Sequence, residues 1–275
     1  MLIRLAPAIF VCLWATGFVG ARLSMPYAEP GSFLALRFGL AFAILAILAL
    51  IVGASWPKRN DAIHAMIAGS LIHGIYLGGV FWAVNRGMPG GISAVLVGLQ
   101  PLLAAFMAYG WIGEKITTRH LIGLPIGLLG VVLVLWPGLD LTSSGINAPT
   151  IVACVLAVLS ISLGTVYQKR YLTGVDLRTG TALQYVGAFV PVFLLAFLFE
   201  NFQITWNTST LFALGWLLFV LSIAAVFLLM WLIREGSVAK VSSLFFLVPA
   251  VAAAMTWFLF GETLLPLQIG LRCSR

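Results

Sequence analysis

The chain has 275 residues, of which 62% are hydrophobic and only 8% are charged. Soluble domains carry about 25% charged residues. The composition therefore excludes a water-soluble globular protein and indicates an all-α, multi-span membrane protein that sits in a lipid bilayer. The net charge of +7 is typical of nucleic-acid-binding proteins as well. Here, however, the basic residues lie in short loops between apolar runs, which is the pattern that orients membrane proteins, so no nucleic-acid partner is expected.

Nine apolar runs are each long enough, at about 20 residues, to cross a bilayer. They are predicted at residues 5–23, 33–52, 64–84, 91–111, 121–136, 151–167, 180–199, 211–233 and 238–260. A tenth run begins at Leu264 and is interrupted by Arg272, so we expect the tenth helix to be cut short before the chain ends at Arg275.

Lysine and arginine predict the orientation of these spans. With the N-terminus in the cytoplasm, ten of the fifteen basic residues fall on the cytoplasmic side and only Arg22 and Arg86 fall on the other. This excess is the positive-inside signal of a protein in the cell inner membrane. We therefore predict a multi-pass inner-membrane protein with a cytoplasmic N-terminus.

The chain uses one pattern twice. Pro101 aligns with Pro249 at an offset of 148 residues, and residues 34–42 (LALRFGLAF) align with residues 181–189 (TALQYVGAF) at an offset of 147. Spans one to five therefore correspond to spans six to ten. Because five is an odd number, the second copy is inverted in the membrane relative to the first.

These correspondences predict ten transmembrane helices, the last of them truncated, arranged as two inverted five-helix repeats around a central cavity. The first repeat covers residues 1–138 and the second covers residues 147–275. Residues 139–146 form an extracytoplasmic linker, which lies in a run of turn-forming residues.

Pro101 and Pro249 each lie near the middle of an apolar span. A proline at mid-span removes one backbone hydrogen bond and crowds the preceding turn, so the helix bends or breaks there. Paired interruptions in the two halves of a repeat point to the central binding site of a transporter. We predict that spans four and nine bend at these two prolines during transport.

Several motifs occur in the same order as in a known family. They are a Trp-x-x-Gly-Phe-Val-x-x-Arg run at residues 14–22, Ala-Leu-Arg-Phe at residues 35–38, Pro101, and a Gly-Glu pair after spans four and nine. With these motifs the chain resembles the EamA-type transporters of the drug/metabolite transporter superfamily, and most closely the YddG-type amino-acid exporters. The resemblance implies ten helices, a central cavity, export of small metabolites such as amino acids, and no cofactor.

Two polar residues near the middle of spans are candidates for the cavity wall. His73 lies in span three, with Tyr76 three residues later and thus on the same helical face. An ionisable side chain at this depth is costly unless it faces protein or a watery cavity, so His73 either lines the cavity, relays protons, or bonds to a neighbouring helix. Gln100 precedes Pro101 and is a candidate for substrate contact, with interhelical packing as the alternative.

Arg37 lies about two turns into span two. Its guanidinium is a candidate clamp for the carboxylate of an amino-acid substrate. The alternative is that Arg37 extends to the extracytoplasmic interface or pairs with a loop acid such as Glu29.

Further cavity candidates are aromatic or hydroxylic. Trp14, Phe245 and Phe246 are predicted to contribute cavity walls, with Phe245 and Phe246 just ahead of Pro249. Ser160, in span six, either contacts substrate or bonds to a backbone carbonyl.

The sequence also constrains the energy source. It has no phosphate-binding loop of the Gly-x-x-x-x-Gly-Lys-Ser/Thr type, and its eight acidic residues fall at or near span ends. Facilitated export is therefore the leading mechanism, with proton coupling through His73 as the alternative. Residues for enzyme catalysis or metal binding are not predicted, because no nucleophile–base pair or metal-ligand spacing is found. We expect a monomer that handles a small-molecule substrate.

Overall fold

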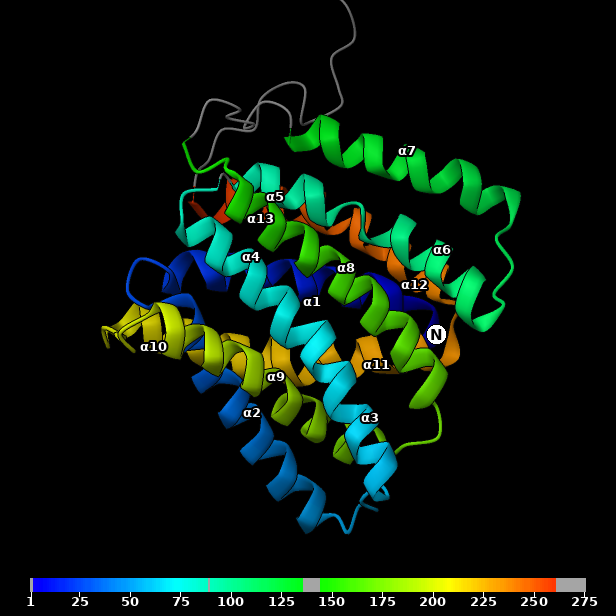
Figure 1. Cartoon of the computed structure of the whole chain (residues 1–275), viewed down its shortest axis with the longest axis horizontal. Helices are drawn as coiled ribbons and strands as arrows, with labels where there is room; N and C mark the ends of the chain where they lie inside the picture. The colour runs from blue at the N-terminus through cyan, green and yellow to red at the C-terminus, as the bar shows by residue number, and fades with distance from the viewer. Residues whose placement is uncertain (1, 89, 136–143, 261–275) are drawn as a thin grey trace, which may run out of the picture.

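The computed structural model describes residues 2–88, 90–135 and 144–260 (Figure 1). Within these ranges every regular element is a helix, and a single antiparallel bridge joins Ala28 to Ile204. The predicted all-helical class is confirmed. The expected tenth span and most of the linker lie outside the described residues.

Five of the predicted spans are single helices: α1 (Leu2–Ser24), α2 (Pro30–Ile51), α7 (Thr118–Leu135), α8 (Ala148–Tyr171) and α9 (Leu177–Phe199). The other four are interrupted. Span three comprises α3 (Arg59–Gly69), η1 (Ser70–Ile75) and α4 (Tyr76–Asn85), and span four comprises α5 (Gly90–Val97) and α6 (Gln100–Ile112). Span eight comprises α10 (Thr208–Trp216), η3 (Leu217–Ala225) and α11 (Val226–Glu235), and span nine comprises α12 (Val238–Ser243), η4 (Leu244–Phe246) and α13 (Val248–Phe260).

All nine predicted spans thus correspond to helices that begin and end within a few residues of the predicted bounds. In the described part of the chain, six helical stretches are long and apolar enough to cross a membrane, and further apolar helices are shorter. The outer faces of these helices expose Leu, Ile and Phe side chains. Apolar surfaces of this kind are the ones that a bilayer covers.

The interruptions occur at matching places in the two halves. Spans three and eight each contain a π-helical segment, and these segments begin 147 residues apart. Spans four and nine each break just before a proline, since Pro101 is in the first turn of α6 and Pro249 is in the first turn of α13. The helix breaks predicted at the two prolines are therefore present.

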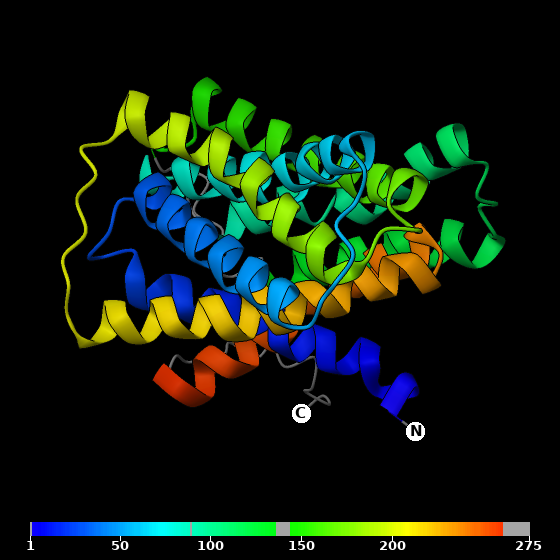
Figure 2. The same cartoon turned by 90° about the horizontal axis from the view of Figure 1, so that it is seen from below.

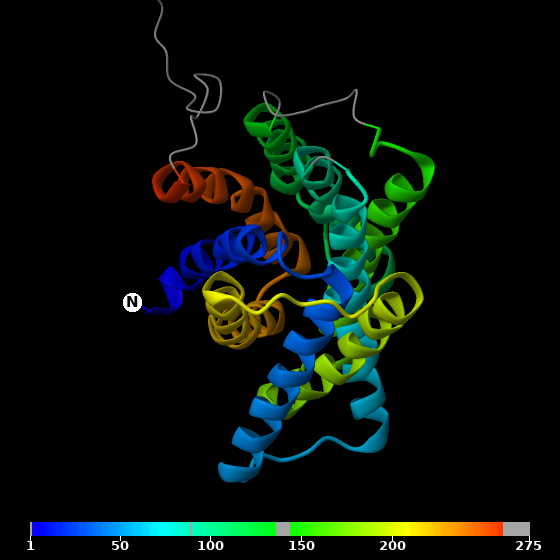
Figure 3. The same cartoon turned by 90° about the vertical axis from the view of Figure 1, so that its left-hand side faces the viewer.

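The packing of the helices follows an approximate two-fold relationship. α2 packs along its repeat counterpart α9 (Figures 2 and 3). η3 contacts α2 as η1 contacts α9, and α1 contacts α13 as α8 contacts α6. In Figure 1 the pair α5–α6 runs from left to right and the pair α12–α13 runs from right to left. This antiparallel course is the arrangement expected of an inverted repeat.

Two glycines allow the backbone of α9 to make direct contact with the backbone of span three. A Cβ added to Gly69 would lie 1.9 Å from the carbonyl oxygen of Gln184, and one added to Gly187 would lie 1.9 Å from that of Met66. Ser70 then donates a hydrogen bond of 2.6 Å to the carbonyl of Gly187. This close contact fixes the π-helical segment of span three against the middle of α9.

Candidate functional site

A buried group of polar and aromatic side chains lies where α2, α9, η1 and η3 meet. We call Arg37, Phe38, His73, Tyr185 and Ser222 the central cluster. The Arg37 Nε donates to the Ser222 hydroxyl at 2.7 Å, and the Tyr185 hydroxyl donates to the Ser222 carbonyl. The Tyr185 ring stacks on Phe38 with centroids 5.6 Å apart and on His73 with centroids 5.4 Å apart. Span two, span three, span seven and span eight therefore share one polar contact region.

The two π-helical segments supply His73 and Ser222 to the central cluster. A π-helical turn shifts the backbone hydrogen-bond pattern and is frequent at functional sites. Here it places a polar residue from each of two equivalent helices against the α2–α9 pair.

Arg37 neither extends to the membrane interface nor pairs with Glu29, which were the two alternatives to a carboxylate clamp. Its side chain is only 3% exposed and is directed to Ser222, so it does not extend to the membrane interface. Glu29 does not pair with it, because the Glu29 carboxylate accepts hydrogen bonds from the backbone amides of Asn201 and Gln203. No salt bridge is found for Arg37 among the described residues. The Arg37 guanidinium is buried and bonded to a neutral hydroxyl, so its positive charge is not compensated. A ligand anion would bind strongly to such a group.

His73 and Tyr76 are not directed to the same helix, contrary to the sequence interpretation. His73 stacks on Tyr185 of α9, whereas Tyr76 packs with Ala157 and Ile161 of α8. The π-helical segment that ends between the two residues explains the difference, because the spacing of side chains around a π-helix is not that of an α-helix. The His73 Nε2 atom is buried and has no hydrogen-bond partner among the described residues.

Gln100 connects the two interrupted spans. Its side-chain Nε2 donates to the Ser242 hydroxyl of α12 at 3.2 Å, and its backbone carbonyl accepts from the Ser162 hydroxyl of α8 at 3.3 Å. The Gln100 Oε1 is buried without a partner in the described structure. Ser160 donates to the Leu71 carbonyl at 2.9 Å, which is the backbone-bonded alternative for this residue.

The three aromatic candidates do not form one wall. Trp14 lies edge-on to Phe245 with centroids 5.4 Å apart, and Phe10 completes this group between α1 and η4. Phe246 points elsewhere, against α7, where a Cβ added to Gly127 would lie 2.5 Å from its ring. Only Trp14 and Phe245 of this set lie together, at the break of span nine.

A small cavity lies against α9, next to the central cluster. Its volume of about 10 Å³ has room for roughly one water molecule. Among the side chains that line it are Gln168, Thr181 and Gln184, and the Gln184 Nε2 donates to the side-chain Oε1 of Gln168 at 2.7 Å. The Thr181 Oγ1 and the Gln184 Oε1 are buried without partners in the described structure. Gln184 is also a close neighbour of the His73 ring.

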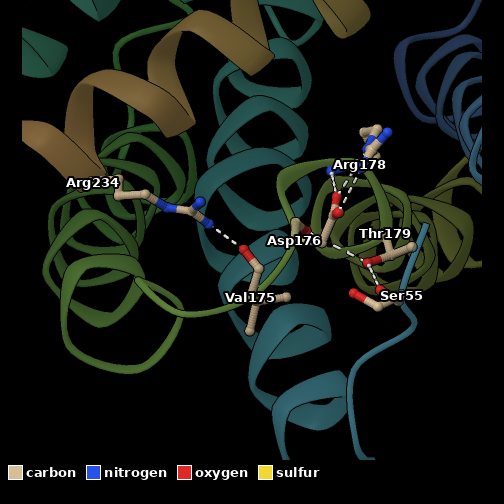
Figure 4. A network of polar contacts seen from close by, with 6 residues as sticks. All are labelled: Ser55, Val175, Asp176, Arg178, Thr179 and Arg234. Carbon is tan, nitrogen blue, oxygen red and sulfur yellow. Dashed lines mark hydrogen bonds and ion pairs between the residues drawn. The ribbon is translucent and has the colours of Figure 1, made fainter.

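This small cavity adjoins an open cleft of about 350 Å³, because Asp176, Leu177 and Arg234 line both. Figure 4 shows the contacts at this end: the Arg234 guanidinium donates to the Val175 carbonyl, and Arg178 pairs with Asp176 at 2.9 Å. The hydrogen bond from Arg178 lowers the pKa of the Asp176 carboxyl below its ordinary value, so Asp176 is ionised at neutral pH. We call this the Asp176 end.

The opposite end is closed by two loops that lie together at the left of Figure 2. The Glu29 carboxylate accepts from the amides of Asn201 and Gln203, as described above. The Glu200 carboxylate accepts from the Gly31 amide at 2.7 Å, and from the amide and the hydroxyl of Ser32 at 2.7 Å each. We call this set, with the Ala28–Ile204 bridge, the Glu29 latch.

Glu29 and Asp176 are repeat counterparts, 147 residues apart, and each precedes the first residue of a helix. The carboxylate of Glu29 joins two loops, whereas that of Asp176 bonds mainly to Arg178, two residues away. The two ends of the molecule are therefore in different states: one is latched and the other has an open cleft.

Sequence reasoning missed Thr181, Gln184, Tyr185 and Ser222. One signal was available, because Gln184 and Tyr185 align with Arg37 and Phe38 at the offset of 147. Ser222 carried no such signal, since single serines inside apolar helices usually bond to their own backbone. In the described residues, no group of three His, Cys, Asp or Glu could hold a metal ion.

The chain is similar to known proteins in sequence and in structure. The family model described as the EamA-like transporter family matches residues 3–136 and again residues 148–271. The uncharacterized inner membrane transporter YedA of Escherichia coli K12 is 27% identical over 254 residues, covering 92% of this chain and 81% of its own. The uncharacterized transporter YvbV of Bacillus subtilis is 27% identical over 229 residues, covering 77% and 72%.

A third relative has a more specific name. A probable amino-acid metabolite efflux pump of Salmonella typhimurium is 23% identical over 270 residues, covering 95% of this chain and 88% of its own. A protein of known crystal structure superimposes with a TM-score of 0.78 at 19% identity, covering 97% of this chain and 91% of that one. This last similarity concerns the fold.

Proposed function

Because the chain belongs to the EamA-like transporter family and spans a membrane, we propose that it exports amino acids or related small metabolites from the cytoplasm across the inner membrane. The observation that carries this proposal is the buried central cluster between the two repeats, beside a cavity that leads to a cleft at the Asp176 end. A polar interior reached from one side at a time is what alternating access requires. The name of the Salmonella relative supports amino-acid metabolites as the substrate class.

The Asp176 end is proposed to face the cytoplasm. Arg178 and Arg234 lie there (Figure 4), and Lys169 donates to the Arg234 carbonyl; the positive-inside pattern places such residues on the cytoplasmic side. The Glu29 latch then closes the extracytoplasmic side. In this orientation the structure is an inward-facing state, in which substrate reaches the cavity from the cytoplasm before export.

Arg37 is proposed to hold the carboxylate of the substrate in the central cluster. The guanidinium presents five donors, of which the Nε–H is directed to Ser222, so the remaining donors can form a bidentate pair with a carboxylate. His73 and Tyr185 pack beside it and would contact the remainder of the substrate once the cluster opens. Phe246 is not proposed as a substrate contact, because it packs against α7.

Switching between states is proposed to occur by bending at Pro101 and Pro249. The breaks that precede these prolines leave α5 and α6, and likewise α12 and α13, free to change their relative angles. The Gln100–Ser242 hydrogen bond couples the two breaks, because it joins the first residue of α6 to α12. In the outward-facing state, the Glu29 latch opens and the Asp176 end closes.

Transport in proteoliposomes tests the proposal. Purified protein is reconstituted with a mixture of labelled amino acids inside, and efflux is measured with and without a pH gradient. Saturable efflux that the gradient does not change supports facilitated export. Loss of label at the rate of protein-free liposomes would contradict transport of this substrate class.

Proton-coupled export is the second candidate, and the unpartnered Nε2 of buried His73 is the observation that favours it. Under this mechanism an inward-directed proton gradient accelerates efflux, and replacing His73 with Gln abolishes that acceleration while facilitated efflux continues. The same proteoliposomes distinguish the two mechanisms.

A further inference from the structure

Two unsatisfied acceptor atoms line the small cavity on α9. The Thr181 Oγ1 and the Gln184 Oε1 belong to residues one helical turn apart, so they lie on one face of the helix. Each residue is only 1% exposed. Buried polar atoms are almost always hydrogen-bonded, so two unsatisfied acceptors lining the same cavity mark a place where a small donor group can bind.

The size and chemistry of the cavity restrict that group. The cavity of about 10 Å³ admits a group about as large as water, which includes an ammonium. An ammonium donates hydrogen bonds and accepts none, which matches the two free acceptors, and the Asp176 carboxylate that lines the same cavity favours its positive charge. A carboxylate is larger and would leave both acceptors unsatisfied.

The charges around the adjoining cleft require a counter-charge on the same ligand. Arg178 and Arg234 line the cleft together with Asp176, so the lining carries one positive charge in excess. A simple amine would add to this excess, whereas a zwitterion brings its own carboxylate to the Arg234 side. The cleft volume of about 350 Å³ leaves room for a side chain.

We infer that Thr181, Gln184, Asp176 and Arg234 form a loading site for zwitterionic amino compounds, in which the ammonium enters the cavity between Thr181 and Gln184. This inference rests on the proposed function, and it adds a site at the open end that is separate from Arg37. The substrate binds at the loading site in the inward-facing state and moves on to Arg37 when the central cluster opens.

Competition in proteoliposomes tests the loading site with matched compounds. Counterflow of labelled leucine is inhibited with leucine, with 4-methylpentanoate, which lacks the amino group, and with isoamylamine, which lacks the carboxylate. A parallel set uses phenylalanine, 3-phenylpropanoate and phenethylamine. We expect each amino acid to inhibit about tenfold more strongly than either partial analogue, because each lost charged group forfeits charge-assisted hydrogen bonds.

The Thr181→Val variant keeps the shape of the side chain and removes one acceptor. We expect it to reduce the preference for leucine over 4-methylpentanoate to below about threefold. The matched control is Thr165→Val, because the buried Thr165 hydroxyl is already bonded to Ile161 of its own helix at 2.7 Å. The control variant should keep the wild-type preference.

The outcomes separate this inference from the proposed function. Wild-type protein that transports leucine but is inhibited equally by leucine and 4-methylpentanoate overturns the loading site alone. An unchanged preference in Thr181→Val, with the same thermal stability as wild type, also overturns it. Absence of saturable counterflow with either amino acid overturns both the loading site and amino-acid export.

Discussion

Phe38 and Tyr185 occupy the same position in the two repeats, and their side chains stack directly on each other. They lie 147 residues apart in the chain, yet their ring centroids are 5.6 Å apart with an interplanar angle of 28°. Two equivalent residues can contact each other only where the symmetry axis passes between them. The α2–α9 contact at this pair therefore marks the approximate two-fold axis of the transporter, and the central cluster lies on it.

The tyrosine hydroxyl distinguishes the two members of this pair. Replacing Tyr185 with Phe makes the pair identical and removes the hydrogen bond to the Ser222 carbonyl in the π-helical segment of span eight. We expect a loss of stability of about 1 kcal/mol, since a typical buried hydrogen bond contributes that amount. Thermal unfolding in detergent measures it, with Tyr109→Phe, an exposed tyrosine, as the control. Equal stability of the two variants would show that the Ser222 bond contributes nothing.

Removal of the Arg37 charge should separate transport from stability. Arg37→Gln eliminates the proposed partner of the substrate carboxylate, so we expect transport of amino acids to fall at least about tenfold. Stability should stay level or rise, because a buried charge without an ion pair is costly to fold. Efflux and thermal unfolding are measured on the same preparation.

Arg86→Gln is the matched control, because Arg86 is exposed and stacks on Trp82 at 5.0 Å, outside the central cluster. It should transport at the wild-type rate. Wild-type transport by Arg37→Gln would remove Arg37 from the site.

The proline breaks allow a test of bending. In the Pro101→Ala and Pro249→Ala double variant, alanine restores the backbone N–H groups, so each half-helix can continue into the next. We expect efflux to fall about tenfold with folding preserved, since continuous helices make the change of angle more costly. Pro125→Ala, at an exposed position inside α7, is the control and should leave efflux unchanged. Wild-type efflux by the double variant would rule out bending at these positions.

The sequence predicted the elements better than the contacts between them. The nine spans and the breaks at Pro101 and Pro249 follow from long apolar runs and from the missing N–H of proline, which are local properties. Arg37 and His73 were recognisable because an ionisable residue inside an apolar run is costly. Their partners were not, since Ser222 and Tyr185 reach them from other helices.

The π-helical segment of span three explains why the prediction of a shared face was wrong. The prediction that His73 and Tyr76 share a face assumes 3.6 residues per turn, and the π-helical segment breaks that assumption. Nothing in the residues 70–75 marks a π-helix by composition. The close approach of α9 through Gly69 and Gly187, which holds this segment, becomes visible only in three dimensions.

That close approach makes Gly187 intolerant of a side chain. In Gly187→Ala the new Cβ would meet the backbone of Met66 at 1.9 Å, so α9 and α3 must separate. We expect destabilisation of about 3 kcal/mol or more, at the upper end of overpacking effects. Gly110→Ala is the control, because a Cβ at this α6 position meets nothing within 4 Å. A thermal unfolding midpoint for Gly187→Ala equal to that of wild type would contradict the backbone contact.

The Glu29 latch should set the resting state of the transporter. Glu29 and Glu200 together accept hydrogen bonds from four backbone amides and one hydroxyl at the closed end. The Asp176 end has a counterpart for Glu29 but not for Glu200, because the position 147 residues before Glu200 is Gly53. In the proposed orientation, the inward-facing state is therefore expected to be the more strongly latched of the two, and neutralising both glutamates should shift the population outward.

Labelling of an introduced thiol measures this shift. Phe227→Cys places a thiol on the wall of the open cleft, where we expect a membrane-impermeant maleimide to reach it from the cytoplasmic side. Adding Glu29→Gln and Glu200→Gln should slow this labelling about tenfold or more, since charged hydrogen bonds contribute about 1.5–3 kcal/mol each. Glu235→Gln, at an exposed position of α11, is the matched control and should not change the rate. If the double glutamine variant is labelled from the cytoplasmic side as fast as its parent, the latch does not hold the inward-facing state.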